Sequence, residues 1–338
     1  MAIALRILFV AIFVSLSFMA PAKEKIDIAI VETLPVPIVT ESRKAFETEL
    51  QRILPNKDIQ FRVFNAEGSV EQAKTFLSDE LSSSPADLIV TVATLATRAV
   101  VNSNEVLTTP KLFMAVSEPV TEGIVPAFGA VSKRNITGES HVVDADIKLE
   151  MLEGVLKASN PNKIFRIGLI HSTYPSSYNA VNSLLALQKR YKNIVFVPIQ
   201  TPYVPGEAGL ELMKEDVITT LKSEYESLDG YWLSAGPLIE THHLIGAIKK
   251  HTGLLPLFAE SVDAVKQGAL IGIVSQPQDI GKSAANTAKQ LLAQGSSATF
   301  PVEKIENFTV AVNVSTAIKL QLPIPSYYLK LSEQHVYQ

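Results

Sequence analysis

Short apolar runs and segments of helical periodicity alternate along most of the chain. The first helical segment places Phe46, Leu50 and Ile53 on one face, at the spacing that packs a helix onto a sheet. The apolar runs of this first series, which are rich in β-branched residues, predict strands over 26–31, 59–64, 87–93 and 111–116. Alternation on this scale is typical of a parallel sheet covered by helices on both faces.

A second series of the same kind follows a stretch, 117–164, that has the character of a crossover. Its predicted strands are 165–170, 194–199, 230–234, 255–259 and 269–274. Two such series predict two similarly built α/β lobes. The tail then adds a helix over 279–293 and a strand over 308–312, so the chain can cross between the lobes again.

Composition adds a targeting segment to this picture. With 338 residues, 47% hydrophobic and 19% charged, the chain can bury cores in two domains. In residues 1–22, however, one basic residue, Arg6, precedes about 14 apolar residues and an A-x-A site at Ala20-Pro21-Ala22. This is the pattern of a secretory signal peptide, and an uncleaved signal anchor is the alternative, although a span needs ~20 residues. The mature protein is expected to be soluble and periplasmic.

Cysteine count and charge narrow the chemistry. The chain has no cysteine, which removes disulfides, thiolate metal sites, a cysteine nucleophile and the lipid-bearing cysteine of a bacterial lipoprotein. Removing Arg6 from the 30 basic residues leaves 29 against 34 acidic ones, a net charge of −5, without any basic cluster. Nucleic acid is therefore not expected as a partner.

Polar residues follow most of the predicted strands. In open parallel sheets, ligands bind outside the carboxyl ends of the strands, where helix N-termini present unpaired amides. The segment DLIVTVATLATRAV, residues 87–100, ends its apolar run at Thr94, which is expected to cap a helix that begins near Leu95. The free amides there would attract a carboxylate or another anion by roughly 1 kcal/mol. The alternative, for Thr94 and for every other polar strand end, is a simple cap or turn.

Four aromatic residues near the strand ends could stack on a flat ligand or bind a cation. They are Tyr174, Tyr178, Tyr203 and Trp232. Trp232 lies inside a predicted strand and is expected in the core. Tyr174 is therefore the better ligand candidate.

No catalytic, metal or cofactor site is predicted. The segment TGESH places Ser140 near His141 but lacks the G-x-S-x-G elbow, and sequence neighbours do not make a nucleophile and its base. His242 and His243 are adjacent on a predicted helix and point about 100° apart, so they cannot bind one metal ion from one face. No dinucleotide fingerprint or P-loop follows a strand. The chain is accordingly not expected to be an enzyme.

Several segments, read together, carry a resemblance to a known family. They are PIVTESRKAF (37–46), NAEGSVEQA (65–73), DLIVTVATLATRA (87–99), MAVSEPV (114–120), NITGES (135–140), VKQGAL (265–270), DIGKSA (279–284) and AVNVSTAIKLQLPIP (311–325). In this order and spacing they resemble the ABC-transporter substrate-binding protein family, whose better-known members take up tryptophan and other aromatic amino acids. The resemblance covers nearly all of residues 26–325.

The resemblance implies a type I periplasmic-binding-protein fold. This is an α/β architecture of two doubly wound parallel-sheet lobes, joined by three crossovers and closing on a ligand like a hinged clamp. After the signal peptide, the first lobe would comprise 23–138 plus 277–302, and the second 139–276 plus 303–338. The tail helix would return to the first lobe and the tail strand to the second.

The resemblance also carries ligand-facing positions onto this chain. Those in or beside the first lobe are Thr33, Asn65, Thr94, Ser117, Glu118 and Ser140, and those in the second are Tyr174, Ser177, Ser234 and Glu260. Relatives often carry Thr-Asp-Asn where this chain has Ala235-Gly236-Pro237, and Asp-Tyr-Tyr where it has Gln276-Pro277-Gln278. A missing carboxylate removes one natural partner for an amino group, which weakens the expectation of an amino-acid ligand.

By this resemblance the chain is an exported, monomeric solute-binding protein. It would capture a small polar or aromatic molecule in the cleft between its lobes and hand it to a membrane permease, without catalysing a reaction. The alternative is a periplasmic sensory module of the same fold that docks on a membrane signalling receptor. A secreted hydrolase using Ser140 or Glu118 is a third class, which turnover of an ester or glycoside substrate would indicate.

Overall fold

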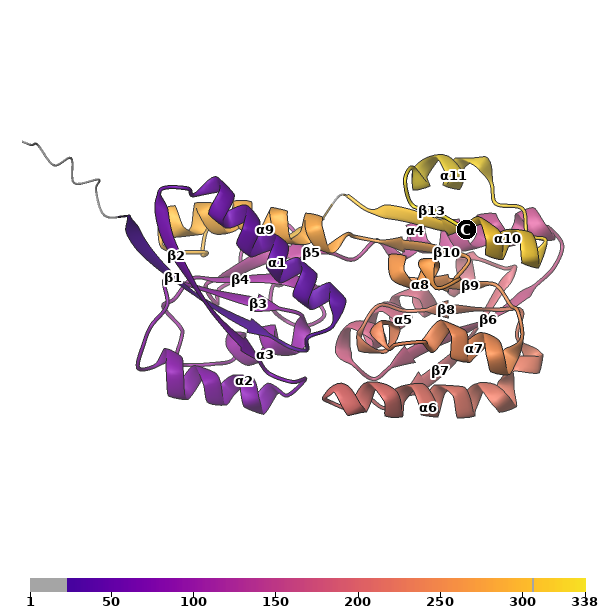
Figure 1. Ribbon diagram of the computed structural model, residues 1–338, viewed down its shortest axis with the longest axis horizontal. Coiled ribbons are helices and arrows are strands. Elements are labelled where there is room, and N and C mark those ends of the chain that lie inside the picture. The colour runs from indigo at the N-terminus through magenta and orange to yellow at the C-terminus, as the bar shows by residue number, and fades with distance from the viewer. Residues whose placement is uncertain (1–22, 306) are drawn as a thin grey trace, which may run out of the picture.

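The computed structural model describes residues 23–305 and 307–338, which form two lobes lying side by side (Figure 1). The predicted signal peptide, residues 1–22, lies outside the described residues. Within the described ranges, no helix combines the length and the apolar character that a membrane crossing requires.

The first lobe is built on a sheet with the strand order β11-β5-β4-β3-β1-β2, in which every pairing is parallel. Because β1 lies inside the sheet and the chain adds strands on both sides of it, helices cover both faces. The strands are β1 (Glu24–Glu32), β2 (Lys57–Asn65), β3 (Leu88–Val92), β4 (Lys111–Val116), β5 (Ile136–Ser140) and β11 (Glu303–Lys304).

Helices α1 and α9 lie together on one face of this sheet, and α2 and α3 on the other (Figure 1). Phe46 and Leu50 of α1 are fully buried against it, as their spacing predicts. Gly281 of α9 allows a close approach, because a Cβ there would lie only 2.4 Å from the Ser42 carbonyl oxygen of α1. The helical segments of this lobe are α1 (Pro37–Ile53), α2 (Val70–Phe76), the π-helix η1 (Leu77–Leu81), α3 (Thr94–Val101) and α9 (Pro277–Gln294).

The second lobe has the strand order β13-β12-β10-β9-β8-β6-β7. The pairing of β12 with β10 is antiparallel, a departure from the expected parallel sheets. The reason is that β12 enters from the first lobe, at the edge where the parallel strands end, and has to run away from that edge. The strands are β6 (Phe165–Ser172), β7 (Ile194–Thr201), β8 (Gly230–Leu233), β9 (Leu257–Ala259), β10 (Ile271–Val274), β12 (Thr309–Asn313) and β13 (Val336–Tyr337).

Two apolar cores cover the faces of the second sheet. One packs α4, α5 and the C-terminal helices against it, and the other packs α6, α7 and α8. Trp232 of β8 is fully buried and stacks on Phe258, as expected for a core residue. The helices are α4 (Ala145–Ser159), α5 (Pro175–Leu187), η2 (Gln188–Arg190), α6 (Glu207–Glu224), η3 (Tyr225–Ser227), η4 (Pro237–Glu240), α7 (Leu244–Thr252), α8 (Val262–Lys266), α10 (Val314–Leu320) and α11 (Ser326–Ser332).

Three crossovers join the lobes, following β5, β10 and β11. The Ser275 hydroxyl lies 2.6 Å from the carbonyl oxygen of His141 and 3.3 Å from that of Asn307, so one side chain contacts all three segments. Because β5 ends at Ser140 and β11 at Lys304, the first sheet extends slightly past the expected lobe limits of 138 and 302.

The predicted strands of both series and the tail helix and strand are confirmed, with shifts at their ends. Strand β5, inside the NITGES segment, was not predicted as a strand. Its five residues mix apolar, glycine and polar side chains and show neither clean alternation nor a continuous apolar run.

Candidate ligand-binding cleft

A cavity lies between the lobes, at the carboxyl ends of the parallel strands. Its volume is about 210 Å³, many times the roughly 10–15 Å³ that a single water requires. The chain reaches it from both lobes: from the loop after β1 and the start of α1, the ends of β3 and β4, the crossovers, and the loops after β8 and β9. The topology therefore brings the strand ends of both sheets to one shared cavity.

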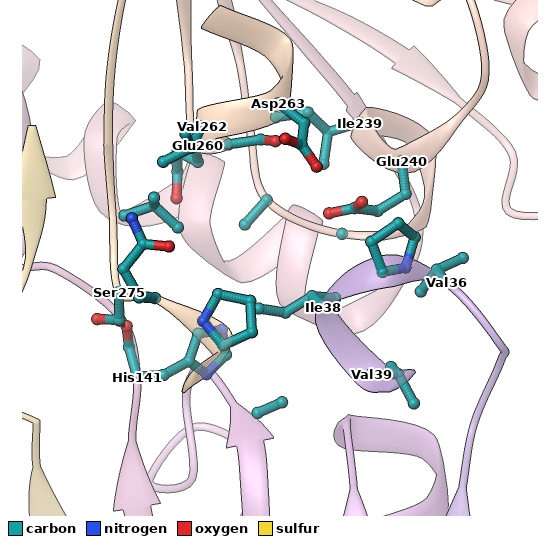
Figure 2. A pocket seen from close by; sticks show the side chains of 18 of the residues that line it. Val36, Ile38, Val39, His141, Ile239, Glu240, Glu260, Val262, Asp263 and Ser275 are labelled. Carbon is teal, nitrogen blue, oxygen red and sulfur yellow. Dashed lines mark hydrogen bonds between the residues drawn. The ribbon is translucent and has the colours of Figure 1, made fainter. Parts of the chain in front are cut away.

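One wall of the cavity is aliphatic. Val36, Ile38 and Val39 line it from the beginning of α1 in the first lobe, and Ile239 and Val262 line it from the second. Figure 2 shows these side chains around the cavity, with the Ile38 side chain lying between the two lobes. A ligand with an apolar body fits such a wall, because it removes both surfaces from water.

The N-terminus of α3 is built differently from the prediction. Thr94 is the first residue of α3, and the N-cap is Ala93, at φ 71° and ψ 168°, a conformation that glycine usually adopts. The Thr33 hydroxyl caps the helix instead, since it accepts a hydrogen bond from the Ala96 amide at 3.2 Å. Thr94 is therefore not the cap. The capping oxygen comes from Thr33, which follows β1 directly.

The second lobe covers the remaining space at this helix end. The hydroxyl of Tyr174, a residue only 3% exposed, interacts with the Thr33 side chain and with the backbone of Leu95. Burial raises the pKa of this hydroxyl to about 12, so it stays neutral. The expectation of free amides awaiting an anion is wrong for this arrangement of the lobes, because Thr33 and Tyr174 take the positions that a carboxylate would need.

Glu260, at the end of β9, has partners from its own lobe for both of its carboxylate oxygen atoms. Its carboxylate lies 2.6 Å from Nζ of Lys148 and accepts a hydrogen bond from Nε1 of Trp232 at 2.9 Å. Both charged side chains are almost completely buried, at 3% and 4% exposed. Glu260 lines the cavity as a neutralised ion pair.

Glu240 lies in η4, a few residues after β8. Unlike Glu260, it has no cation beside its carboxylate among the described residues. The charges that act on its carboxylate are two other carboxylates, Asp263 and Glu41, and no described residue donates a hydrogen bond to it or pairs with it. Burial, with a smaller contribution from these like charges, raises its pKa to about 8. Figure 2 shows the Glu240 and Asp263 carboxylates directed into the cavity.

The hinge side of the cavity presents unsatisfied nitrogen atoms. Nδ1 of His141, a residue 8% exposed, has no hydrogen-bond partner among the described residues, and neither does Nε2 of Gln276. Burial lowers the pKa of His141 to about 4, so the ring stays neutral at physiological pH. A neutral imidazole nitrogen can accept or donate one hydrogen bond, depending on the tautomer, so Nδ1 is open to a polar group of a ligand.

Of the ten residues predicted to face the ligand, four line the cavity. These are Thr33, Ser117, Tyr174 and Glu260. Three of the four already have partners within the protein: Thr33 caps α3, the Tyr174 hydroxyl interacts with Thr33, and Glu260 pairs with Lys148. The predicted residues therefore share several strand ends with the cavity, but they do not coincide with the side chains that lack a partner there.

The other six predicted residues do not line the cavity, and most have local structural roles. They are Asn65, Thr94, Glu118, Ser140, Ser177 and Ser234. Asn65 accepts a hydrogen bond from the Glu67 amide in a turn, the Ser140 hydroxyl donates to the Ser117 carbonyl, and Ser234 lies within reach of the Ile170 carbonyl at 3.5 Å.

Ser177 explains one of the departures from the family pattern. Its hydroxyl donates to the Ala235 carbonyl at 2.6 Å. Gly236 follows at φ 135°, and a Cβ there would lie 2.1 Å from the Ser177 oxygen. A side chain such as the relatives' Asp has no room at this position, because the serine hydroxyl occupies it.

Sequence reasoning missed the cavity residues with the most unusual environments. Glu240, Asp263, His141 and Lys148 all line the cavity. Glu240 and Asp263 had a local signal, since each is a carboxylate shortly after a predicted strand. His141 was judged as a catalytic candidate with Ser140 and set aside, and Gln276 was noted only as a departure.

The histidines set aside as metal ligands behave as surface residues. His242 and His243 are exposed. In the part of the chain that the structure describes, no group of three or more His, Asp or Glu side chains is placed to hold a metal ion.

Contacts across the cleft hold the lobes together opposite the crossovers. Nδ2 of Asn179 on α5 donates to Glu122 of the first lobe at 2.8 Å. The Tyr203 hydroxyl lies 3.4 Å from the Gly68 carbonyl oxygen. Neither contact involves a residue of the cavity lining, and together with Tyr174 at the start of α3 they join the two lobes.

Comparison with solved structures supports the architecture. The chain is similar to a Streptococcus pneumoniae ABC domain in complex with L-Trp, with a TM-score of 0.77 and 19% identity over 91% of this chain and 98% of that one. A conserved domain protein of Vibrio cholerae O1 biovar El Tor gives 0.77 and 18% identity over 93% and 99%. An Agrobacterium vitis solute-binding protein with bound allitol gives 0.62 and 14% over 88% and 99%. At these identities the likeness shows the fold, which is the predicted type I periplasmic-binding-protein fold.

The family assignment comes from the sequence. No curated protein sequence matches the chain. A model of the family described as ABC transporter substrate binding protein matches residues 27–336, which span both lobes and all three crossovers. The chain therefore belongs to the ABC transporter substrate-binding protein family, as its motifs predicted.

Proposed function

We propose that the protein is exported and captures a small polar or aromatic molecule in the cleft between its lobes for delivery to a membrane permease. The observation that carries the proposal is the cavity at the strand ends of both sheets, lined by buried polar groups that have no partner among the described residues. The family supplies the context of an ABC transporter.

Closure of the lobes would bury the ligand. Tyr174, Tyr203 and Asn179 reach from the second lobe to the first, so contacts made only in the closed form contribute to the free energy of closure. The three crossovers meet at Ser275, which makes this the natural place for the hinge.

A thermal-shift screen tests binding directly. A ligand that binds only the folded protein raises its stability by about 2.7 kcal/mol at a concentration a hundred times Kd. Amino acids, amines, purines, sugars and short peptides should be screened with the mature chain, and at least one class should raise the melting temperature with saturable dependence on concentration. No shift with any class would contradict the proposal.

The destination of the ligand requires a second experiment. Fractionation of cells carrying the full chain should place the mature protein in the periplasm, shortened by its predicted signal peptide. Deletion of the partner permease should abolish uptake of the bound solute. Unchanged uptake together with an altered signalling response would favour the periplasmic sensory module.

A further inference from the structure

The cavity contains an acidic group that the protein itself does not neutralise. Within the described residues, Glu240 has neither an ion-pair partner nor a hydrogen-bond donor, and the charges near it are Asp263 and Glu41. Lys266, which also lines the cavity, is paired with Asp263 at 2.7 Å. An ionised Glu240 therefore lacks a positive partner.

A second group in the same cavity also lacks a partner. Nδ1 of His141 is buried and has no hydrogen-bond partner among the described residues. A buried polar atom without a partner costs free energy, and a ligand N–H recovers it in the tautomer where Nδ1 accepts. His141 lies on the opposite side of the cavity from Glu240 (Figure 2).

An anionic ligand group finds no unpaired cation among the described residues of the cavity, and the unpartnered Nε2 of Gln276 offers it only a neutral donor. The amides at the start of α3 are taken by Thr33 and approached by the Tyr174 hydroxyl. Both lysines that line the cavity, Lys148 and Lys266, are in ion pairs. A ligand carboxylate would have to displace one of these contacts and would add negative charge to a cavity already lined by four carboxylates, those of Glu41, Glu240, Glu260 and Asp263.

We propose that the ligand is a small organic cation, an amine or guanidine without an α-carboxylate, whose charged nitrogen binds Glu240 and whose apolar body lies against the wall formed by Val36, Ile38 and Ile239. A further N–H of the ligand would reach Nδ1 of His141. The inference rests on the proposed function, because it names the class of ligand for the same cleft.

Matched pairs of probes test this class. Agmatine, tyramine and tryptamine differ from arginine, tyrosine and tryptophan by the α-carboxylate alone. Calorimetry with the mature chain should give an affinity at least tenfold higher for one or more of the amines than for the matching amino acid. Equal or tighter binding of the amino acid in every pair would overturn the inference.

Variants of Glu240 test whether this residue binds the amine. For the amine that binds, Glu240→Gln should lower the affinity by at least tenfold, and Glu240→Asp should retain part of it because the charge is kept. Glu215→Gln, an exposed position on α6, serves as the control and should bind like the unaltered protein. An amine that binds Glu240→Gln with unchanged affinity would contradict the role of Glu240.

Other outcomes separate this inference from the proposed function. Saturable binding of a neutral sugar or a purine, with no binding of any amine, would overturn the organic cation and leave the solute-binding function in place. Absence of binding by every probe would overturn both.

Discussion

Glu260 and Glu240 are two carboxylates in the wall of one cavity, on loops of the same lobe, with opposite surroundings. Glu260 meets the Lys148 ammonium and the Trp232 indole N–H, so its charge is balanced and both its oxygen atoms are bound. Among the described residues, the only charges that act on Glu240 are those of the carboxylates Asp263 and Glu41, and burial raises the pKa of Glu240 to about 8. The Glu260 carboxylate stabilises the lobe itself, whereas the Glu240 carboxylate is free to bind a donor or a cation of a ligand.

The comparison teaches that position near a ligand site does not identify a binding residue. Family resemblance pointed to Glu260, and the geometry shows that the protein itself uses that carboxylate. The residue with unused capacity is Glu240, because no described residue pairs with it. The variants below test this difference, starting with the largest expected effect.

Lys148→Met should be strongly destabilising. It leaves the buried Glu260 carboxylate without its cation, and breaking a buried pair in this way costs about 3–5 kcal/mol. Urea unfolding at pH 7 measures the loss. Lys266→Met, in which an exposed pair is broken, should lose only about 0–1 kcal/mol. Similar losses in the two variants would show that burial of the Lys148 pair makes no difference.

Glu240→Gln should stabilise the unliganded protein at alkaline pH. The folded pKa of about 8 lies above the ordinary 4.5, so between these values the folded protein keeps a proton that the unfolded chain releases. Stability is consequently lost as pH rises through this window, and the loss is complete above it. The glutamine variant avoids that loss and should be more stable by roughly 2–3 kcal/mol at pH 9.

Urea unfolding of both proteins at pH 5 and pH 9 checks this expectation. The advantage of the variant should be small at pH 5, where the folded protein holds Glu240 protonated. A constant difference at both pH values would indicate a packing effect of the amide.

His141→Gln should reduce the sensitivity of the protein to acid. The folded pKa of about 4 lies below the ordinary 6.5, so as pH falls below 6.5 the unfolded chain takes up a proton first. The unaltered protein should lose about 2 kcal/mol between pH 7 and pH 5 from this group. The variant should lack that part of the loss, as urea unfolding at the two pH values would show. Identical pH profiles would exclude His141 as a buried neutral group.

Thr33→Val and Thr94→Val compare two threonines at one helix end, with shape conserved. Thr33 caps α3, so its variant should lose about 1 kcal/mol, whereas Thr94 makes no capping bond and its variant should lose less. Differential scanning calorimetry resolves the order. A larger loss for Thr94→Val would restore Thr94 as the cap.

Periodicity predicted most of the fold because it reflects burial on one face of each element. Phe46 and Leu50 of α1 and the apolar runs of the central strands are buried where the pattern placed them. Strand β5 and the antiparallel pairing of β12 were not predicted, since the first lacks a clear pattern and the second depends on the direction from which the chain enters the sheet. Local sequence carries neither signal.

For the candidate site, the sequence predicted several of the loops that line the cavity but not which of their side chains are free. Thr33, Ser117, Tyr174 and Glu260 do line the cavity, because parallel topology brings those loops together. Whether each side chain is available to a ligand depends on its partners. Glu260 is paired with a lysine 112 residues away, and the Tyr174 hydroxyl meets Thr33 of the opposite lobe.

The sequence by itself determined the alternating elements, the two lobes and the family, and it predicted several of the strand ends that line the cavity. Each of these follows from residue spacing and from motifs within short segments of the chain. Only the tertiary structure decided which polar groups there are already satisfied and which are not. Electrostatic and hydrogen-bonding balance is set by neighbours in space, and at this cleft those neighbours come from two lobes and three crossovers.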